Sequence, residues 1–81
     1  MLAKLDLPEG ALDSVPCVRV FGRSTAEIEN HNGVLEFSDS TVRLRTALGI
    51  LNISGNGLKI RCADRQTIVC TGEILSIAYE A

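Results

Sequence analysis

Hydrophobic and polar residues alternate with a period of two from Cys17 onward, and clusters of turn residues interrupt the alternation at short intervals. Such a pattern is typical of short strands joined by tight hairpins. It predicts an all-β domain, an antiparallel meander of about seven or eight short strands. The turns are expected at Gly22-Arg23-Ser24, Asn32-Gly33, Asp39-Ser40, Ala47-Leu48-Gly49, Gly55-Asn56-Gly57, Asp64-Arg65-Gln66 and Gly72-Glu73.

The hairpins can be checked through their register, because a wrong register would place apolar residues opposite charged ones. A two-residue turn at Asn32-Gly33 sets Ile28 opposite Phe37, and the next turns set Val42 between Phe37 and Ile53. Ile53 in turn lies opposite Leu58. The strands are therefore expected to share one continuous apolar face, with a solvated polar face behind it.

An apolar face of this size must be covered in water. We expect the sheet to curl into a small barrel or a sandwich, or to dock against another protein. The segment from Leu5 to Val15 is expected to form a short N-terminal helix or turn, with Asp6 as its cap, that closes one end. A short β-solenoid is the alternative, because regular turn spacing is also its signature.

The length of 81 residues predicts one domain, residues 1–81, with residues 1–16 as its N-terminal cap segment. A chain this short buries little surface, so self-association or a protein partner is expected. The net charge of −2 and the scattered cations give no basic stripe, which argues against nucleic acid as a partner. No apolar run approaches the length of a membrane span, and the first seven residues are too short for a signal peptide. We therefore expect a cytoplasmic protein.

Cys17, Cys62 and Cys70 are an odd number and contain no Cys-x-x-Cys pair. They are expected to be small buried hydrophobes, without a disulfide or a zinc site.

His31 is the only histidine and has two interpretations. It could be a general base or metal ligand with Asp39 or Glu29, and Ser38 and Ser40 would supply the residue types of a hydrolase triad. Alternatively, its ring nitrogens bind loop backbone. We favour the second interpretation, because neither a Gly-x-Ser-x-Gly motif nor a second histidine is present. The sequence thus predicts no enzyme, no cofactor and no metal, with a small hydrolase or metal-dependent enzyme centred on His31 as the alternative.

Five cations are expected near one end of the sheet, where they would suit an acidic partner surface or anionic lipid head groups. Cations that merely keep this face solvated are the simpler explanation. The five are Arg43, Arg45, Lys59, Arg61 and Arg65.

The run IENHNGVLEFSD at positions 28–39 resembles the YabP/YqfC family of sporulation proteins. The resemblance continues through Val42-Arg43-Leu44, Leu48-Gly49-Ile50-Leu51, Ile53-Ser54-Gly55, Leu58-Lys59-Ile60 and Gly72-Glu73-Ile74, and so covers nearly the whole chain. The opening Leu5-Asp6-Leu7-Pro8 and the later Val15-Pro16 look more like the YqfC branch than the YabP branch.

This resemblance implies a non-enzymatic role in endospore formation, in the mother cell at the stage of cortex and coat assembly. It also implies a protein partner, with the membrane sporulation protein YqfD as the candidate, so that membrane association would occur only through that partner, at the forespore outer membrane. The Asn-His turn is the most recognisable motif of the family, which singles out Asn30, His31 and Gly33. To these we add Glu36 and Arg43, which are expected to face each other on the polar side.

Overall fold

The computed structural model describes residues 15–80, and these residues form six strands that all pair antiparallel. This confirms the predicted all-β, antiparallel class, and no helix occurs within this range. The predicted N-terminal helix or turn lies outside the described residues apart from its last position, Val15. The strands are β1 (Cys17–Phe21), β2 (Thr25–Glu29), β3 (His31–Phe37), β4 (Thr41–Thr46), β5 (Gly49–Ala63) and β6 (Thr67–Tyr79).

The six strands form one open sheet in the order β1-β2-β6-β5-β4-β3. Strands β2 and β3 follow each other in the chain but lie far apart in this order, with only Asn30 between them. The predicted meander therefore holds along β1–β2 and β3–β6 and breaks at Asn30. The backbone of Asn30 has φ 65°, a left-handed conformation that redirects the chain. Asparagine tolerates this conformation better than most residues.

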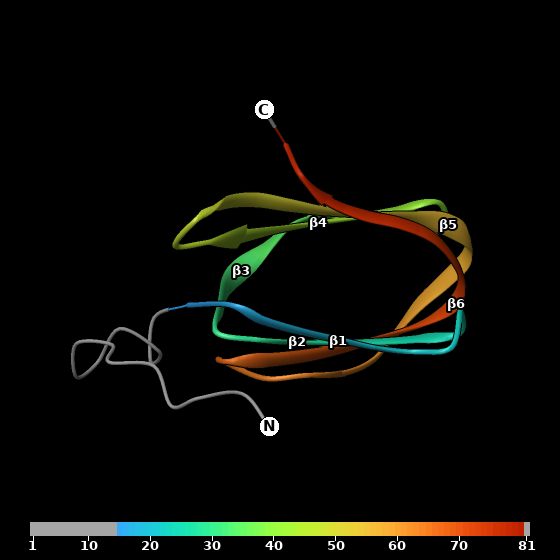
Figure 1. Cartoon of the computed structure of the whole chain (residues 1–81), viewed down its shortest axis with the longest axis horizontal. Helices are drawn as coiled ribbons and strands as arrows, with labels where there is room; N and C mark the ends of the chain where they lie inside the picture. The colour runs from blue at the N-terminus through green and yellow to red at the C-terminus, as the bar shows by residue number, and fades with distance from the viewer. Residues whose placement is uncertain (1–14, 81) are drawn as a thin grey trace, which may run out of the picture.

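The two longest strands, β5 and β6, bend together, so the sheet folds over into two layers (Figure 1). The lower layer in this view contains β1, β2 and the adjoining halves of β5 and β6. The upper layer contains β4, much of β3 and the other halves of the long strands. The sheet is thus folded like a sandwich but is not a closed barrel, because β1 and β3 remain separate edges.

Two glycines make the bend possible. A Cβ on Gly55 would overlap the carbonyl oxygen of Glu73 on the facing strand. A Cβ on Gly72 would lie 2.6 Å from the carbonyl oxygen of Gly57, and Gly72 also has φ 135°. The two backbones therefore meet more closely than any side chain allows, which is a recognised use of glycine within strands.

The prediction of seven or eight short strands was wrong for the same reason. Gly55-Asn56-Gly57 and Gly72-Glu73 are not hairpin turns but bends inside β5 and β6, of 15 and 13 residues. Ile53 accordingly pairs with Ile77 rather than with Leu58. The alternative of a solenoid was also wrong, because a solenoid requires parallel pairing and every pair here is antiparallel.

The predicted turn at Asn32-Gly33 is the third incorrect one, since both residues lie within β3. Ile28 therefore pairs with Val18 and Ile68, not with Phe37. The remaining predicted turns are confirmed as the connections β1–β2, β3–β4, β4–β5 and β5–β6.

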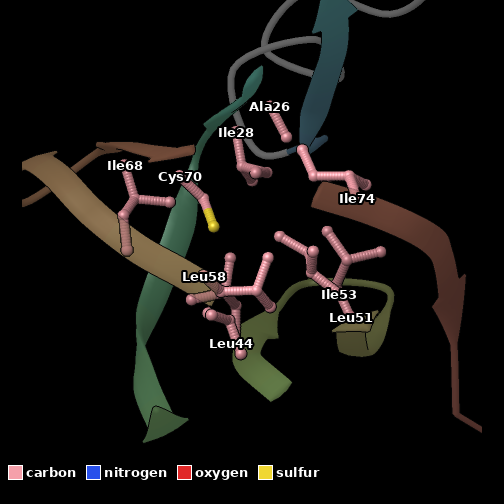
Figure 2. Packing of buried hydrophobic residues seen from close by; sticks show 10 residues of the cluster. Ala26, Ile28, Leu44, Leu51, Ile53, Leu58, Ile68, Cys70 and Ile74 are labelled. Carbon is pink, nitrogen blue, oxygen red and sulfur yellow. The ribbon is translucent and has the colours of Figure 1, made fainter. Parts of the chain in front are cut away.

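The core lies between the two layers (Figure 2). Ile28 and Cys70 of the lower layer face Leu44 and Ile53 of the upper layer, with Leu58 between them. The buried residues of the core are Ala26, Ile28, Val42, Leu44, Leu51, Ile53, Leu58, Ile68, Cys70 and Ile74. Eight of these residues are Ile, Leu or Val, and full burial of one such side chain stabilises a fold by about 1.5–3 kcal/mol.

The predicted apolar row is confirmed at Ile28, Val42, Ile53 and Leu58, which are all buried. It was wrong at Phe37, whose side chain is 49% exposed. Phe37 does pair with Val42, but it ends the outermost strand β3, where no further strand covers it.

The three cysteines differ in their exposure to solvent. Cys70 is buried as predicted, whereas Cys17 and Cys62 are exposed. A register shift between Ile60 and Cys62 sets Cys62 opposite Val69 instead of Ile68 and thereby turns it outward.

Candidate functional site

His31 begins β3 and is buried beside the turn that joins β5 to β6. Its Nδ1 accepts a hydrogen bond from the backbone N–H of Gly33 at 3.1 Å. Its Nε2 lies 3.0 Å from the carbonyl oxygen of Asp64, 33 residues further along the chain. A neutral imidazole with its proton on Nε2 satisfies both contacts, since one nitrogen then accepts and the other donates. This is the arrangement that the second interpretation of His31 predicts.

Asn30 fixes the same corner from the other side. Its backbone N–H donates to the carbonyl oxygen of Gln66 at 2.6 Å, and its side-chain Nδ2 donates to the carbonyl oxygen of Val15 at 2.9 Å. The backbone N–H of His31 also reaches Gln66, at 3.3 Å. Asn30 and His31 therefore join three segments that lie far apart in the sequence: the start of β1, the β2–β3 link and the β5–β6 turn.

The β5–β6 turn is held in shape by Asp64. Its carboxylate accepts hydrogen bonds from the backbone N–H groups of Gln66, at 2.9 Å, and Thr67, at 2.7 Å. These bonds, that of Gln66 first, lower the pKa of the Asp64 carboxyl, because they stabilise its charged form. The Asp64 carboxylate thus stabilises its own turn. The backbone carbonyl oxygen of Asp64 contacts Nε2 of His31.

An open hollow of about 630 Å³ lies at this corner, lined by Asn30, His31, Asn32, Ala47, Asp64, Arg65 and Gln66. Six of these seven lining residues have polar side chains. Two lining groups are of types that act in acid–base catalysis, the His31 ring and the Asp64 carboxylate. Both form hydrogen bonds with backbone groups. These two groups are therefore not arranged as an acid–base pair.

The residues of the hydrolase alternative are not brought together. Ser38 follows the end of β3 and His31 begins it, which separates them by roughly 20 Å of extended chain. The Ser38 hydroxyl accepts the backbone N–H groups of Ser40, at 3.3 Å, and Thr41, at 3.1 Å, and so shapes the β3–β4 turn. Across residues 15–80, no three His, Cys, Asp or Glu side chains group closely enough to hold a metal ion.

Glu36 and Arg43 pair across β3 and β4 as predicted, but in a larger network on the outer face of the upper layer. Arg43 donates to both carboxylate oxygens of Glu80, at 2.6 and 2.8 Å, and to Glu36 at 3.3 Å. Asn52 adds a hydrogen bond to Glu80 at 3.1 Å. The hydrogen bonds from Arg43, and then that from Asn52, lower the pKa of the Glu80 carboxyl. The network ties Glu80, the residue that follows β6, to β5 through Asn52 and to β4 through Arg43.

The predicted basic zone is reduced by this network, because Arg43 is occupied by Glu80. Lys59 and Arg61 are exposed on the second half of β5, and Arg65 is exposed in the turn that follows. Arg45 is exposed on β4. The structure thus places a short cationic strip along one half of β5 rather than a zone of five residues.

The sequence pattern did not predict Gln66, Asn52 or Glu80 as members of these sites. Asp64 and Gln66 were predicted only as turn residues. Their Asp-x-Gln spacing is the one local signal of the turn that contacts His31. Glu80 lies 37 residues from Arg43, and no local pattern links the two.

The fold and the site define a class: a small, open, folded-over β domain in which a buried histidine holds backbone, with exposed strand edges. The model of the YabP family matches residues 15–81. The chain is also 33% identical over 75 residues, covering 93% of this chain and 81% of the relative, to "Uncharacterized protein YqfC" of Bacillus subtilis (strain 168). The chain belongs to the YabP family, which is a family of sporulation proteins.

No helix among residues 15–80 has the length and apolar character that crossing a membrane requires.

Replacement of His31 with alanine is expected to lower the free energy of unfolding by about 1–3 kcal/mol, because the partly buried N–H of Gly33 and the carbonyl of Asp64 lose their partner. Urea unfolding measures this loss. Replacement of Asn32, which is exposed beside it, should change stability by less than about 0.5 kcal/mol. Unchanged stability of His31→Ala, together with loss of function, would instead favour the catalytic interpretation.

The Glu80 network predicts an acid-sensitive contribution to stability. The pKa of Glu80 is lowered in the folded state from the value of 4.5 in an unpaired glutamate, so the contribution is complete above about pH 4.5 and disappears as pH falls through the folded pKa. Unfolding followed from pH 7 downward should show a shallower acid loss for Glu80→Gln than for wild type. The Asp64 carboxyl, whose pKa is also lowered, accounts for part of the remaining loss. Identical pH profiles would contradict the proposed contribution of Glu80.

Proposed function

We propose that the chain is a non-enzymatic binding or assembly module that acts in the mother cell during endospore formation, at the stage of cortex and coat assembly. Membership of the YabP family supports the process, and the geometry supports the binding role. The observation that carries the proposal is the exposed apolar rim of β3.

Strand β3 is one of the two edge strands of the sheet and pairs only with β4. Three of its large apolar side chains are exposed: Val34, Leu35 and Phe37. Exposed apolar side chains at the edge of a sheet are a ready surface against which the apolar side chains of another protein can pack. The side chains of Val34, Leu35 and Phe37 carry no catalytic group.

The partner is proposed to be a membrane protein of the YqfD type. The module itself would remain in the mother-cell cytoplasm and reach the forespore outer membrane only through that protein. An apolar partner surface suits the β3 rim, and the hollow at His31 lies at the other end of the same strand.

The test is spore formation in the organism that carries this chain. Phe37→Lys should reduce the number of heat-resistant spores to the level of a strain without the gene, because a charge at the rim prevents apolar docking. Leu48→Lys is the matched control, since Leu48 is also exposed but lies in the β4–β5 turn. The proposal fails if the Phe37 variant is folded, is present at the normal level and supports normal spore yield.

A further inference from the structure

The second half of β6 has an open backbone edge. Residues Thr67 to Thr71 lie between β2 and β5, and the β1–β2 turn follows them as far as Ile74, whose N–H donates to the carbonyl oxygen of Arg23. Beyond Ile74, among the residues that the structure describes, β6 pairs with β5 alone. Residues 75–79 therefore present unpaired backbone groups on their other side, a ready template for another strand.

The other open edges are protected against such pairing. Strand β1 carries the charge cluster of Arg19, which lies 3.3 Å from Glu27 and 3.5 Å from Glu29. The second half of β5 carries Lys59 and Arg61 and a register shift. Strand β3 has register shifts on both sides of Val34, with Glu36 beyond them. Charges and bulges are the usual means of preventing edge-to-edge association.

Residues 75–79 have neither charge nor proline. Their sequence is Leu-Ser-Ile-Ala-Tyr, and residues 76–79 pair with β5 in regular register. The Leu75 side chain is 54% exposed and that of Tyr79 is 44% exposed. Glu80 would add a charge at the end of this segment, but Arg43 and Asn52 hold its carboxylate on the outer face of the sheet. This edge is thus unprotected where the others are protected.

We propose that residues 75–79 form the interface of a homodimer, in which a second copy of the chain adds its own β6 edge antiparallel. A two-fold interface requires a surface that is complementary to itself. An uncharged segment meets this requirement, since antiparallel pairing about Ile77 sets Leu75 of one copy opposite Tyr79 of the other and opposes no like charges. Lys59 and Arg61 would repel their own copies on the β5 edge.

The size of the interface sets the expected strength. Five paired residues with two exposed apolar side chains bury less area than a standard interface, so the dissociation constant should be roughly micromolar or weaker. The dimer would leave the β3 rim uncovered. The inference therefore goes beyond the proposed function and does not depend on it.

Sedimentation of the isolated full chain over a range of concentrations tests the dimer. We expect a shift from monomer to dimer in the wild type, and a dissociation constant at least about tenfold weaker for Leu75→Lys and for Tyr79→Lys. Leu48→Lys is the matched control, because it adds the same charge to an exposed leucine away from this edge and should dimerise as the wild type does. Thermal unfolding of each variant shows whether it is folded.

Amide hydrogen exchange of the wild type gives a second readout that needs no variant. The backbone amides of residues 75–79 that face away from β5 should exchange more slowly at the concentration where the dimer forms. A chain that is monomeric at every concentration overturns the inference, as does a dimer that is unaffected by both lysine variants. Protection of this edge only when another sporulation protein is added would also overturn it, because the occupant would then not be a second copy. None of these results bears on the spore-yield test of Phe37.

Discussion

Replacement of Gly72 with alanine is expected to lower the free energy of unfolding by about 3–5 kcal/mol, which is most of the stability of a domain this small. The new Cβ would lie 2.6 Å from the carbonyl oxygen of Gly57 on the facing strand, and both groups belong to backbone that cannot move without opening the bend. Chemical unfolding monitored by circular dichroism measures the loss, and a variant that does not fold at all is consistent with it.

Gly49→Ala is the matched control for this result. Gly49 has φ 121°, close to the 135° of Gly72, but a Cβ there would meet nothing within 4 Å. The control isolates the backbone strain, about 1–3 kcal/mol, from the steric overlap. If the two variants lose the same stability, the close approach of β5 and β6 at the bend is not what requires glycine.

Replacement of Leu44 with alanine is expected to cost about 2–5 kcal/mol. Its side chain is fully buried and faces Leu58 between the two layers (Figure 2), so truncation leaves a cavity that the sheet cannot easily close. Equilibrium unfolding in urea gives the value. Leu48→Ala removes the same atoms from a side chain that is 60% exposed and should cost less than about 0.5 kcal/mol. Equal losses would mean that the core does not lie where the two layers meet.

The alternation of apolar and polar residues was sufficient to predict the class of the fold and most of the core. It was insufficient for the long strands, because Gly55-Asn56-Gly57 has the composition of a hairpin turn and is a bend in the middle of β5. Glycine permits both, and only the close approach of the facing backbone at Glu73 distinguishes them. That contact is non-local and leaves no mark in the local pattern.

The same limit applies to the candidate site. The contact from His31 to Gly33 spans two residues and lies within the Asn-His motif that the sequence singled out. Its contact with Asp64 depends on the path of the chain from β2 to β3, which a predicted hairpin at Asn32-Gly33 obscured. Glu36 and Arg43 were predictable as cross-strand neighbours. The bonds from Arg43 to Glu80 require the long β6 to run antiparallel to β5 up to its end.

The bend also explains why apolar side chains remain at the rim. Folding one open sheet over itself buries the middle of the sheet and leaves its outermost strands without a facing layer at their ends. Phe37 illustrates this, since it pairs with a buried residue, Val42, and is itself half exposed. The exposed apolar rim of β3 is thus a consequence of the topology that forms the core.

Photo-crosslinking in sporulating cells tests docking at the β3 rim most directly. A photoreactive residue at position 37 should form an adduct with the membrane protein of the YqfD type, whereas the same residue at position 48 should not. Absence of that adduct at position 37 in a folded protein that is present at the normal level, or an equal yield at both positions, would contradict the account.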